Sequence, residues 1–289
     1  MSFKTYLERK AKNPKVVEGY LYYQEQFIKW LESENLTVES CQYVDLLSYV
    51  KQLKQKERSV YTLNNYVRGI KYYYEYLQAE NKINHNPARR LYIKGQIQQL
   101  PGDLLNKREL NTIYVEYPKE TIVQKRNKVL LGLAIYQALR LDELAALRAE
   151  DIDLHKGTIY VRKAGRGARR ILKLEAHQIL PLQEYINEIL PQIKAKAEHK
   201  NDKLIMSLGK SPGIKEMVCD LNKWLRKKYP RFKNLLHIRS SVISLWIAEK
   251  NIVEVQYLAG HNSITSTEVY KYVNMKDLRK VLDQFHPLR

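Results

Sequence analysis

The stretch LAGHNSITSTEVYKY, residues 258–272, predicts two helices that meet at a tight corner. The apolar pattern over 252–259 predicts the first helix, and Gly260 follows at the position where a left-handed residue commonly ends one. A threonine and a glutamate three positions apart then have the spacing of a capping box, which predicts a second helix. His261 lies at the corner, and Tyr270 lies on the second helix nine positions later.

The charge of the chain points to a polyanionic partner. The 289 residues include 50 Lys and Arg against 31 Asp and Glu, so the formal net charge is +19. A surplus of this size attracts polyanions, and nucleic acid is the first candidate partner. The ordinary alternative is a soluble protein with a well-solvated basic surface. The length is sufficient for two domains with their own cores.

Several classes of protein are excluded by what the sequence lacks. Cys41 and Cys219 are far apart and form neither a disulfide framework nor a metal-binding quartet. The longest uncharged apolar run, residues 129–139, is shorter than the roughly 20 residues that a membrane span needs. The charged N-terminal segment does not resemble a secretion signal, so we expect a reduced, cytoplasmic setting without membrane contact. Glycine-rich phosphate loops and paired metal-ligand motifs are absent.

Residues 1–80 predict a helical DNA-binding domain. Apolar residues recur at helical spacing within 16–31, 44–53 and 59–77, and Ser59 is placed to cap the third of these helices. Basic residues occupy the other helix faces: Lys51, Lys54, Lys56, Arg58, Arg68 and Lys71. Residues 81–106 contain Asn, Pro and Gly with poor periodicity, and we interpret them as a linker.

Residues 107–289 predict a second domain that is mostly helical, with one β-hairpin. In GTIYVRKAGRGARRILKL, residues 157–174, a glycine-containing turn separates two β-rich runs. The tip of this hairpin is strongly basic. The predicted fold class is therefore mostly α with a small β-hairpin or sheet, in which a helical domain precedes a mixed α+β domain.

Two segments resemble the conserved boxes of the tyrosine recombinases, the phage integrase family. LAIYQALRLDELAALRAEDIDL, residues 133–154, is similar to the first box, with Arg140 at a helix corner and Glu143 three positions later. Residues 237–272 are similar to the second box, with Arg239, then Gly260 and His261, then Tyr270. The resemblance covers residues 107–285 by motif. The N-terminal helices resemble the family's core-binding domain only in length and helicity.

The resemblance assigns chemistry to these residues. Breaking a DNA phosphodiester without a metal requires a nucleophile, cations on the non-bridging oxygens and an acid for the leaving oxygen. Arg140 and Arg239 are the expected cationic clamp, because a guanidinium donates two bonds and stays charged. Tyr270 is the expected nucleophile, forming a 3′-phosphotyrosine. Tyr272 lies about 200° further round a helix, so only one of the two tyrosines can face a given site.

The remaining site residues follow from the same resemblance. Lys163, at the end of the first hairpin strand, is the expected general acid, although the turn is about two residues longer than in close relatives. His261 is expected to donate to a phosphate oxygen, and Glu143 to orient a neighbouring arginine or histidine. Other hairpin cations are expected to contact the DNA backbone: Arg162, Arg166, Arg169 and Arg170.

The second box departs from the family pattern at one position. The family has His-x-x-Arg, but here Leu236 stands three positions before Arg239, and His237 comes one position too late. Since a helix rotates about 100° per residue, this displacement matters. Either His237 supplies the general base through a local shift, or the site works without it, or activity is weakened.

The resemblance therefore implies an enzyme, a tyrosine-type site-specific recombinase or integrase. It implies a homo-tetramer on two double-stranded DNA sites, with accessory DNA-binding proteins as further candidate partners. It also implies no metal or other cofactor. The alternatives are a degenerate relative that binds DNA without cleaving it, and a topoisomerase-like nicking-closing enzyme. The C-terminal tail predicts a helix that docks on a neighbouring subunit or on its own, with an apolar stripe formed by Leu278, Val281, Leu282 and Phe285.

The net charge of +19 generates a prediction about affinity. Binding to duplex DNA should weaken steeply with salt, because each phosphate contact releases counterions, with a log–log slope of about −0.9 per phosphate. Fluorescence anisotropy with a labelled duplex over a salt series measures this slope. A flat dependence would contradict a surface that tracks the DNA backbone.

Overall fold

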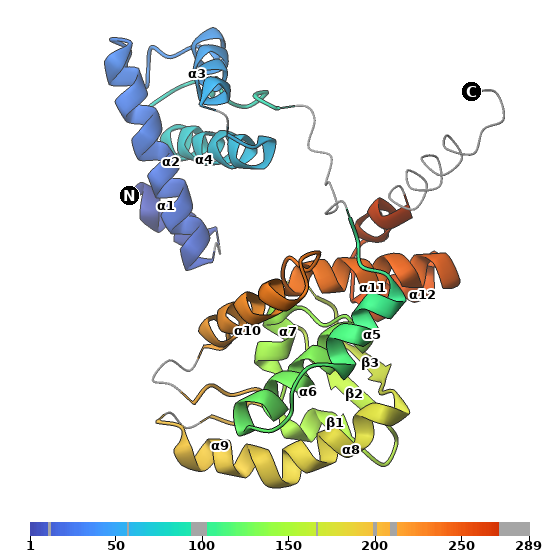
Figure 1. The fold of residues 1–289 in the computed structure, drawn as a ribbon. Coiled ribbons are helices and arrows are strands. Elements are labelled where there is room, and N and C mark those ends of the chain that lie inside the picture. The colour runs from blue at the N-terminus through green and yellow to red at the C-terminus, as the bar shows by residue number, and fades with distance from the viewer. Residues whose placement is uncertain are drawn as a thin grey trace, which may run out of the picture. The chain divides into compact units, whose positions relative to one another are not determined.

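The computed structural model describes residues 1–10, 13–56, 58–93, 103–165, 167–198, 201–208 and 213–271. The chain divides into two compact units, residues 1–98 and 99–289 (Figure 1). The predicted tail helix, Tyr272 and Arg166 lie outside the described residues. Within the described residues, no helix is long and apolar enough to cross a membrane.

The first unit consists of helices packed through aromatic side chains. Its helices are α1 (Phe3–Arg9), α2 (Pro14–Ser33), α3 (Tyr43–Gln55) and α4 (Val60–Ala79). Ser59 caps α4 by accepting a hydrogen bond from the backbone of Thr62, as the sequence predicts. Phe27, Tyr66 and Tyr74 are fully buried between these helices.

The observed boundary between the units differs from the predicted one. Ala88, Leu91 and Ile93 lie in the predicted linker, yet their side chains are buried in the first core. Leu105, near the end of the same segment, is buried in the second core. The first unit therefore extends beyond residue 80, because three spaced apolar side chains attach the segment after α4 to the core.

The second unit packs helices around a small sheet. Its helices are α5 (Lys107–Val115), α6 (Ile122–Tyr136), α7 (Leu141–Ala146), α8 (Ala176–Glu184), α9 (Leu190–Lys196), α10 (Ile214–Lys228), α11 (Leu235–Glu249) and α12 (Ile252–Ala259). A 3₁₀ turn, η1 (Ala149–Asp151), follows α7, and a π-helical turn, η2 (Tyr185–Ile189), joins α8 to α9. Buried Leu130 on α6 and Ile238 on α11 belong to one continuous core.

The sheet contains the predicted hairpin and one short strand besides. The strands β1 (Ile152–Asp153), β2 (Thr158–Val161) and β3 (Arg170–Lys173) run antiparallel in the order β1-β2-β3. Ile159 pairs with Leu172 and Val161 with Arg170, so these side chains share the inward face. The predicted fold class, mostly α with a small β-sheet, is confirmed.

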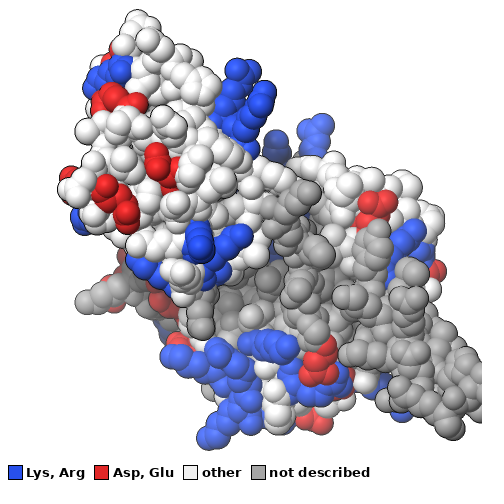
Figure 2. Space-filling view, turned by 90° about the horizontal axis from the view of Figure 1, so that it is seen from above, with Lys and Arg blue, Asp and Glu red and all other residues white. Residues whose placement is uncertain are grey.

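Cations are spread over the described surface in groups. On the face seen in Figure 2, groups of Lys and Arg side chains stand apart from one another, with groups of Asp and Glu among them.

Candidate active site

The corner between α6 and α7 positions Arg140. After α6 ends, Ala138 adopts a left-handed conformation with φ of 48°, which turns the chain sharply. Arg140 is the extended N-cap residue of α7, and its backbone N–H donates to Oε2 of Glu143 at 2.9 Å. The Nε of Arg140 is buried without a hydrogen-bond partner among the described residues. The corner thus presents a guanidinium with an unused donor.

Arg239 on α11 lies in the interior beside this corner. Its guanidinium donates to the carbonyl oxygen of Ala138, and through Nη2 to the carbonyl oxygen of Ala259 at 2.7 Å. Burial, followed by the charge of Arg140, lowers the pKa of Arg239 to about 10. Arg239 therefore stays charged at neutral pH and is held by the backbone on two sides.

The corner after α12 brings His261 to Arg239. Gly260 ends α12 in the left-handed conformation with φ of 63°, as predicted. Nη2 of Arg239 lies 3.3 Å from Nε2 of His261, and Nδ1 of His261 lies 2.9 Å from Oγ1 of Thr267. Burial, followed by the charges of Arg239 and Arg140, lowers the pKa of His261 to about 3. Because arginine only donates, the neutral imidazole accepts at Nε2 and donates from Nδ1 to Thr267.

Tyr270 lies against this histidine. The rings of His261 and Tyr270 stack with their centroids 6.1 Å apart and their planes at 22°. The Tyr270 side chain is largely buried, and its charged form would interact with Arg239. The structure therefore brings together Arg140, Arg239, His261 and Tyr270, which come from three separate segments of the chain.

A buried ion pair between Glu143 and Arg170 connects these segments. Nη1 of Arg170 lies 2.7 Å from Oε1 of Glu143 and Nη2 lies 3.1 Å from Oε2, and both side chains are 0% exposed. Burial alone would raise the pKa of Glu143, but the hydrogen bonds and charge of Arg170 outweigh it and lower the pKa. Oε2 of Glu143 also lies 4.0 Å from Nη1 of Arg239. Glu143 thus binds Arg170 directly and lies close to Arg239.

The prediction that Arg170 contacts DNA does not agree with this structure. Besides Glu143, its guanidinium donates to the carbonyl oxygens of Leu258 at 2.9 Å and Ala168 at 3.1 Å, so it presents no surface to a ligand. The sequence contained a signal that was missed. Arg170 alternates with Leu172 and Leu174, which places all three side chains on the inward face of β3.

Two glycines allow the backbone to approach the ion pair closely. A Cβ atom on Gly260 would lie 2.2 Å from Nη1 of Arg170, and one on Gly167 would lie 2.4 Å from Oε1 of Glu143. The hairpin tip also pairs with the corner, because the N–H of Ala168 donates to the carbonyl oxygen of Gly260 at 3.1 Å. Gly260 therefore serves both the left-handed turn and the packing of Arg170.

The other hairpin cations differ in whether their side chains are exposed or held in ion pairs. Lys163 and Arg169 are exposed at the tip, as a contact with a ligand requires. Arg162 instead pairs with Glu150 at 2.7 Å and Asp151 at 2.8 Å. A DNA phosphate would therefore compete with these carboxylates for the Arg162 guanidinium.

His237 points away from the cluster. Its Nε2 lies 2.9 Å from the carbonyl oxygen of Asp103, and its Nδ1 is buried without a partner among the described residues. Burial lowers the pKa of His237. Leu236, which replaces the expected histidine, is 64% exposed. The local shift that would let His237 act as the base is therefore not observed.

The cluster as a whole is positively charged and suits a phosphate. Arg140, Arg170 and Arg239 lie around the carboxylates of Glu143 and Asp142, so positive charge remains after the ion pair is formed. Buried guanidinium groups bind phosphate oxygens strongly because water does not screen them. Among the described residues, no group of three or more His, Cys, Asp or Glu could hold a metal ion.

Comparison with known proteins gives a consistent result. Residues 103–277 match the family described as the phage integrase family. The tyrosine recombinase XerC of Bacillus pumilus is 24% identical over 284 residues, covering 94% of this chain and 90% of the relative. The tyrosine recombinase XerA of Thermococcus kodakarensis is 24% identical over 289 residues, covering 98% and 93%. The fold is similar to that of the XerH site-specific recombinase bound to its palindromic difH substrate after cleavage, with a TM-score of 0.75 and 18% identity over 92% of this chain and 78% of the other.

The ion pair generates a prediction about stability. Arg170→Met should lower the free energy of unfolding of the second unit by about 3–5 kcal/mol, because it leaves the Glu143 carboxylate buried without its partner. Urea unfolding in a Trp30→Phe background measures this, since the remaining tryptophans, Trp224 and Trp246, belong to the second unit. Arg169→Met is the matched control and should change stability by less than about 0.5 kcal/mol. Equal effects of the two substitutions would contradict the role of the pair.

Proposed function

The chain belongs to the phage integrase family, the tyrosine recombinases, and we propose that it cuts and rejoins duplex DNA at specific sites through a 3′-phosphotyrosine on Tyr270. The observation that carries the proposal is the convergence of Arg140, Arg239, His261 and Tyr270 around the Glu143–Arg170 pair. Three segments distant in sequence contribute to one positively charged cluster, and an ordinary core tyrosine does not require such surroundings.

In the proposed reaction, the Tyr270 oxygen attacks the scissile phosphorus. A bond forms between this oxygen and phosphorus, the bond from phosphorus to the 5′-oxygen breaks, and the 5′-oxygen leaves with a proton. Arg140 and Arg239 stabilise the charge that develops on the non-bridging oxygens. The Tyr270 hydroxyl gives up its proton to water as its oxygen bonds to phosphorus. The reverse attack by a 5′-hydroxyl reseals the strand.

Lys163 is the proposed source of the proton for the leaving oxygen. It is exposed on the hairpin tip, and this tip pairs with the Gly260–His261 corner through Ala168 and Gly167. The pairing keeps the hairpin beside the arginine cluster, so a lysine on the tip can approach a bound phosphate. Arg169 is proposed as a contact to the DNA backbone, and Arg162 and Arg166 as further contacts.

The proposed partners follow from the relatives. The XerH structure contains that recombinase with its DNA substrate, which supports duplex DNA as the partner of this chain. We propose action by four copies on two DNA sites in the cytoplasm, with the N-terminal helices as a second DNA-binding surface. The alternatives of binding without cleavage, or of nicking and closing alone, are less well supported, since the chain retains both clamp arginines and the tyrosine.

Covalent trapping tests the proposed nucleophile. On a duplex nicked near the cleavage site, the short strand end diffuses away and the protein–DNA adduct accumulates. Tyr270→Phe should abolish this adduct, measured by denaturing gel electrophoresis, while DNA affinity stays within about twofold because only a hydroxyl is lost. Tyr272→Phe is the control and should form the adduct. An adduct that persists in Tyr270→Phe but is lost in Tyr272→Phe would refute the assignment.

Substitution of the leaving oxygen by sulfur tests the proposed acid. Lys163→Ala should cleave ordinary DNA at least about 100-fold more slowly than the unsubstituted protein, since general acid catalysis contributes at this level. A bridging 5′-sulfur leaves as a thiolate without a proton, so this DNA should restore the single-turnover rate in Lys163→Ala. Arg239→Ala is the control and should not be restored. Restoration in Arg162→Ala or Arg166→Ala, but not in Lys163→Ala, would place the acid elsewhere on the tip.

A further inference from the structure

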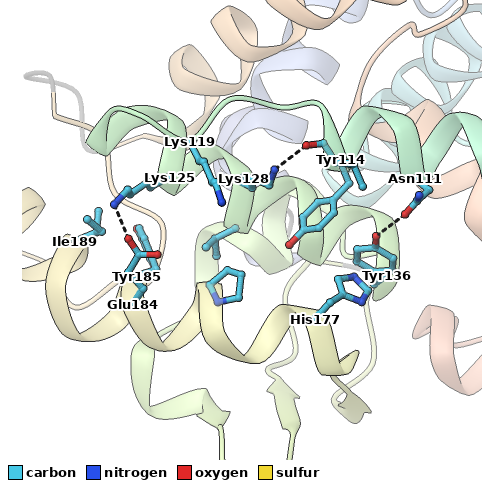
Figure 3. A pocket seen from close by; sticks show the side chains of 13 residues that line it. Asn111, Tyr114, Lys119, Lys125, Lys128, Tyr136, His177, Glu184, Tyr185 and Ile189 are labelled. Carbon is cyan, nitrogen blue, oxygen red and sulfur yellow. Dashed lines mark hydrogen bonds and ion pairs between the residues drawn. The ribbon is translucent and has the colours of Figure 1, made fainter.

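A concave site lies on the second unit, between α5, α6, α8 and η2 (Figure 3). The cavity has a volume of about 700 Å³, which is within the range of roughly 300–1,000 Å³ that small-molecule sites occupy. None of its lining residues belongs to the cluster around Glu143. The proposed recombination chemistry therefore does not account for it.

Three aromatic rings form one wall of the cavity. The ring centroids of Tyr136 and His177 are 4.5 Å apart, and those of Tyr114 and Tyr136 are 5.2 Å apart, both in edge-to-face contact. His177 is exposed, whereas Tyr114 is packed on α6. A flat ligand can add a further ring to such a cluster at little cost, because aromatic faces and edges attract one another.

The hydroxyl of Tyr114 is a donor directed into this space. The residue is only 7% exposed, and its side chain points into the cavity in Figure 3. Burial raises the pKa of Tyr114, so the hydroxyl keeps its proton at neutral pH. A hydroxyl donor that faces a cavity favours a ligand that supplies an acceptor.

The lysines at this cavity make it a site for an anion. Nζ of Lys128 donates to the carbonyl oxygens of Val115 at 3.1 Å and Tyr117 at 2.9 Å, which leaves one of its three N–H groups unused. Burial, followed by the positive charge of Lys119, lowers the pKa of Lys128. Repulsion between these two lysines is relieved when an anion binds between them.

One carboxylate at the cavity does not cancel this charge. Glu184 is paired with Lys125 at 2.5 Å, and both residues line the cavity, so Lys125 already neutralises the negative charge of Glu184.

The backbone is irregular on one side of the cavity. Pro181 lies inside α8, and the π-helical turn Tyr185–Ile189 follows this helix. Both line the cavity, and irregular turns of this kind are frequent at functional sites.

We propose that this cavity binds a small planar organic anion, an aromatic or conjugated ring that carries a carboxylate, sulfonate or phosphate. The ring packs against Tyr136 and His177, and the anionic group accepts hydrogen bonds from Tyr114, Lys119 and Lys128. Such a ligand joins α5, the first helix of the unit, to α8, the helix that follows the hairpin.

Two fluorescent probes with the same rings test the proposal on the full chain. Anilinonaphthalene sulfonate carries an anionic group, and phenylnaphthylamine is its neutral counterpart. The sulfonate should bind to one saturable site at least about tenfold more tightly than the neutral probe, because charge-assisted hydrogen bonds hold it. Equal affinity for the two probes would refute an anion site.

Single substitutions locate the binding. Tyr114→Phe keeps the ring and removes the donor, and Lys119→Gln removes an exposed cation, so each should weaken sulfonate binding by about tenfold. Lys107→Gln is the control, since this exposed lysine on α5 does not line the cavity, and it should leave the affinity unchanged. The probe should also raise the Tm of the unsubstituted chain more than that of Tyr114→Phe. Unchanged binding in Tyr114→Phe and Lys119→Gln would show that the probe binds elsewhere and would refute the proposal.

Discussion

The buried ion pair between Glu143 and Arg170 is the constraint on which the rest of the site depends. Removing both charges from water is costly, and the cost is offset only if every hydrogen-bonding group of the pair is satisfied. The satisfying groups come from α7, from the hairpin tip and from the end of α12. These three elements are therefore fixed to one another, and with them Arg140, the hairpin and His261.

The cations of this region have two different roles, organising the site and contacting a substrate, which the sequence alone does not distinguish. Arg170 organises the site from within, whereas Lys163 and Arg169 stay exposed for a substrate. Arg239 combines features of both groups. It is buried and held by backbone carbonyl groups, as Arg170 is, yet it remains charged beside His261. The glycines at 167 and 260 complete the arrangement, because a side chain at either position would displace the pair.

Sequence patterns predicted the features that depend on local chemistry. The capping residue Ser59, the left-handed Gly260 and the turn of the hairpin each determine structure within a few positions, and each prediction is confirmed. Long-range packing was not predictable in the same way. The burial of Leu91 and Ile93 in the first core, and the contact of His237 with Asp103, depend on segments that meet only after folding. Arg170 has the charge of a DNA contact, but its inward position on β3 makes it part of the buried ion pair instead.

The most direct test asks whether the Glu143–Arg170 pair positions the catalytic segments or only stabilises the fold. The double variant Glu143→Leu with Arg170→Met removes both charges, so it should lose less stability than Arg170→Met alone, since no unpaired buried charge remains. Its single-turnover cleavage of a nicked duplex should nevertheless fall by at least about 100-fold at saturating protein, because the cationic and histidine segments are no longer held together. A folded double variant that cleaves at the rate of the unsubstituted protein would contradict the account.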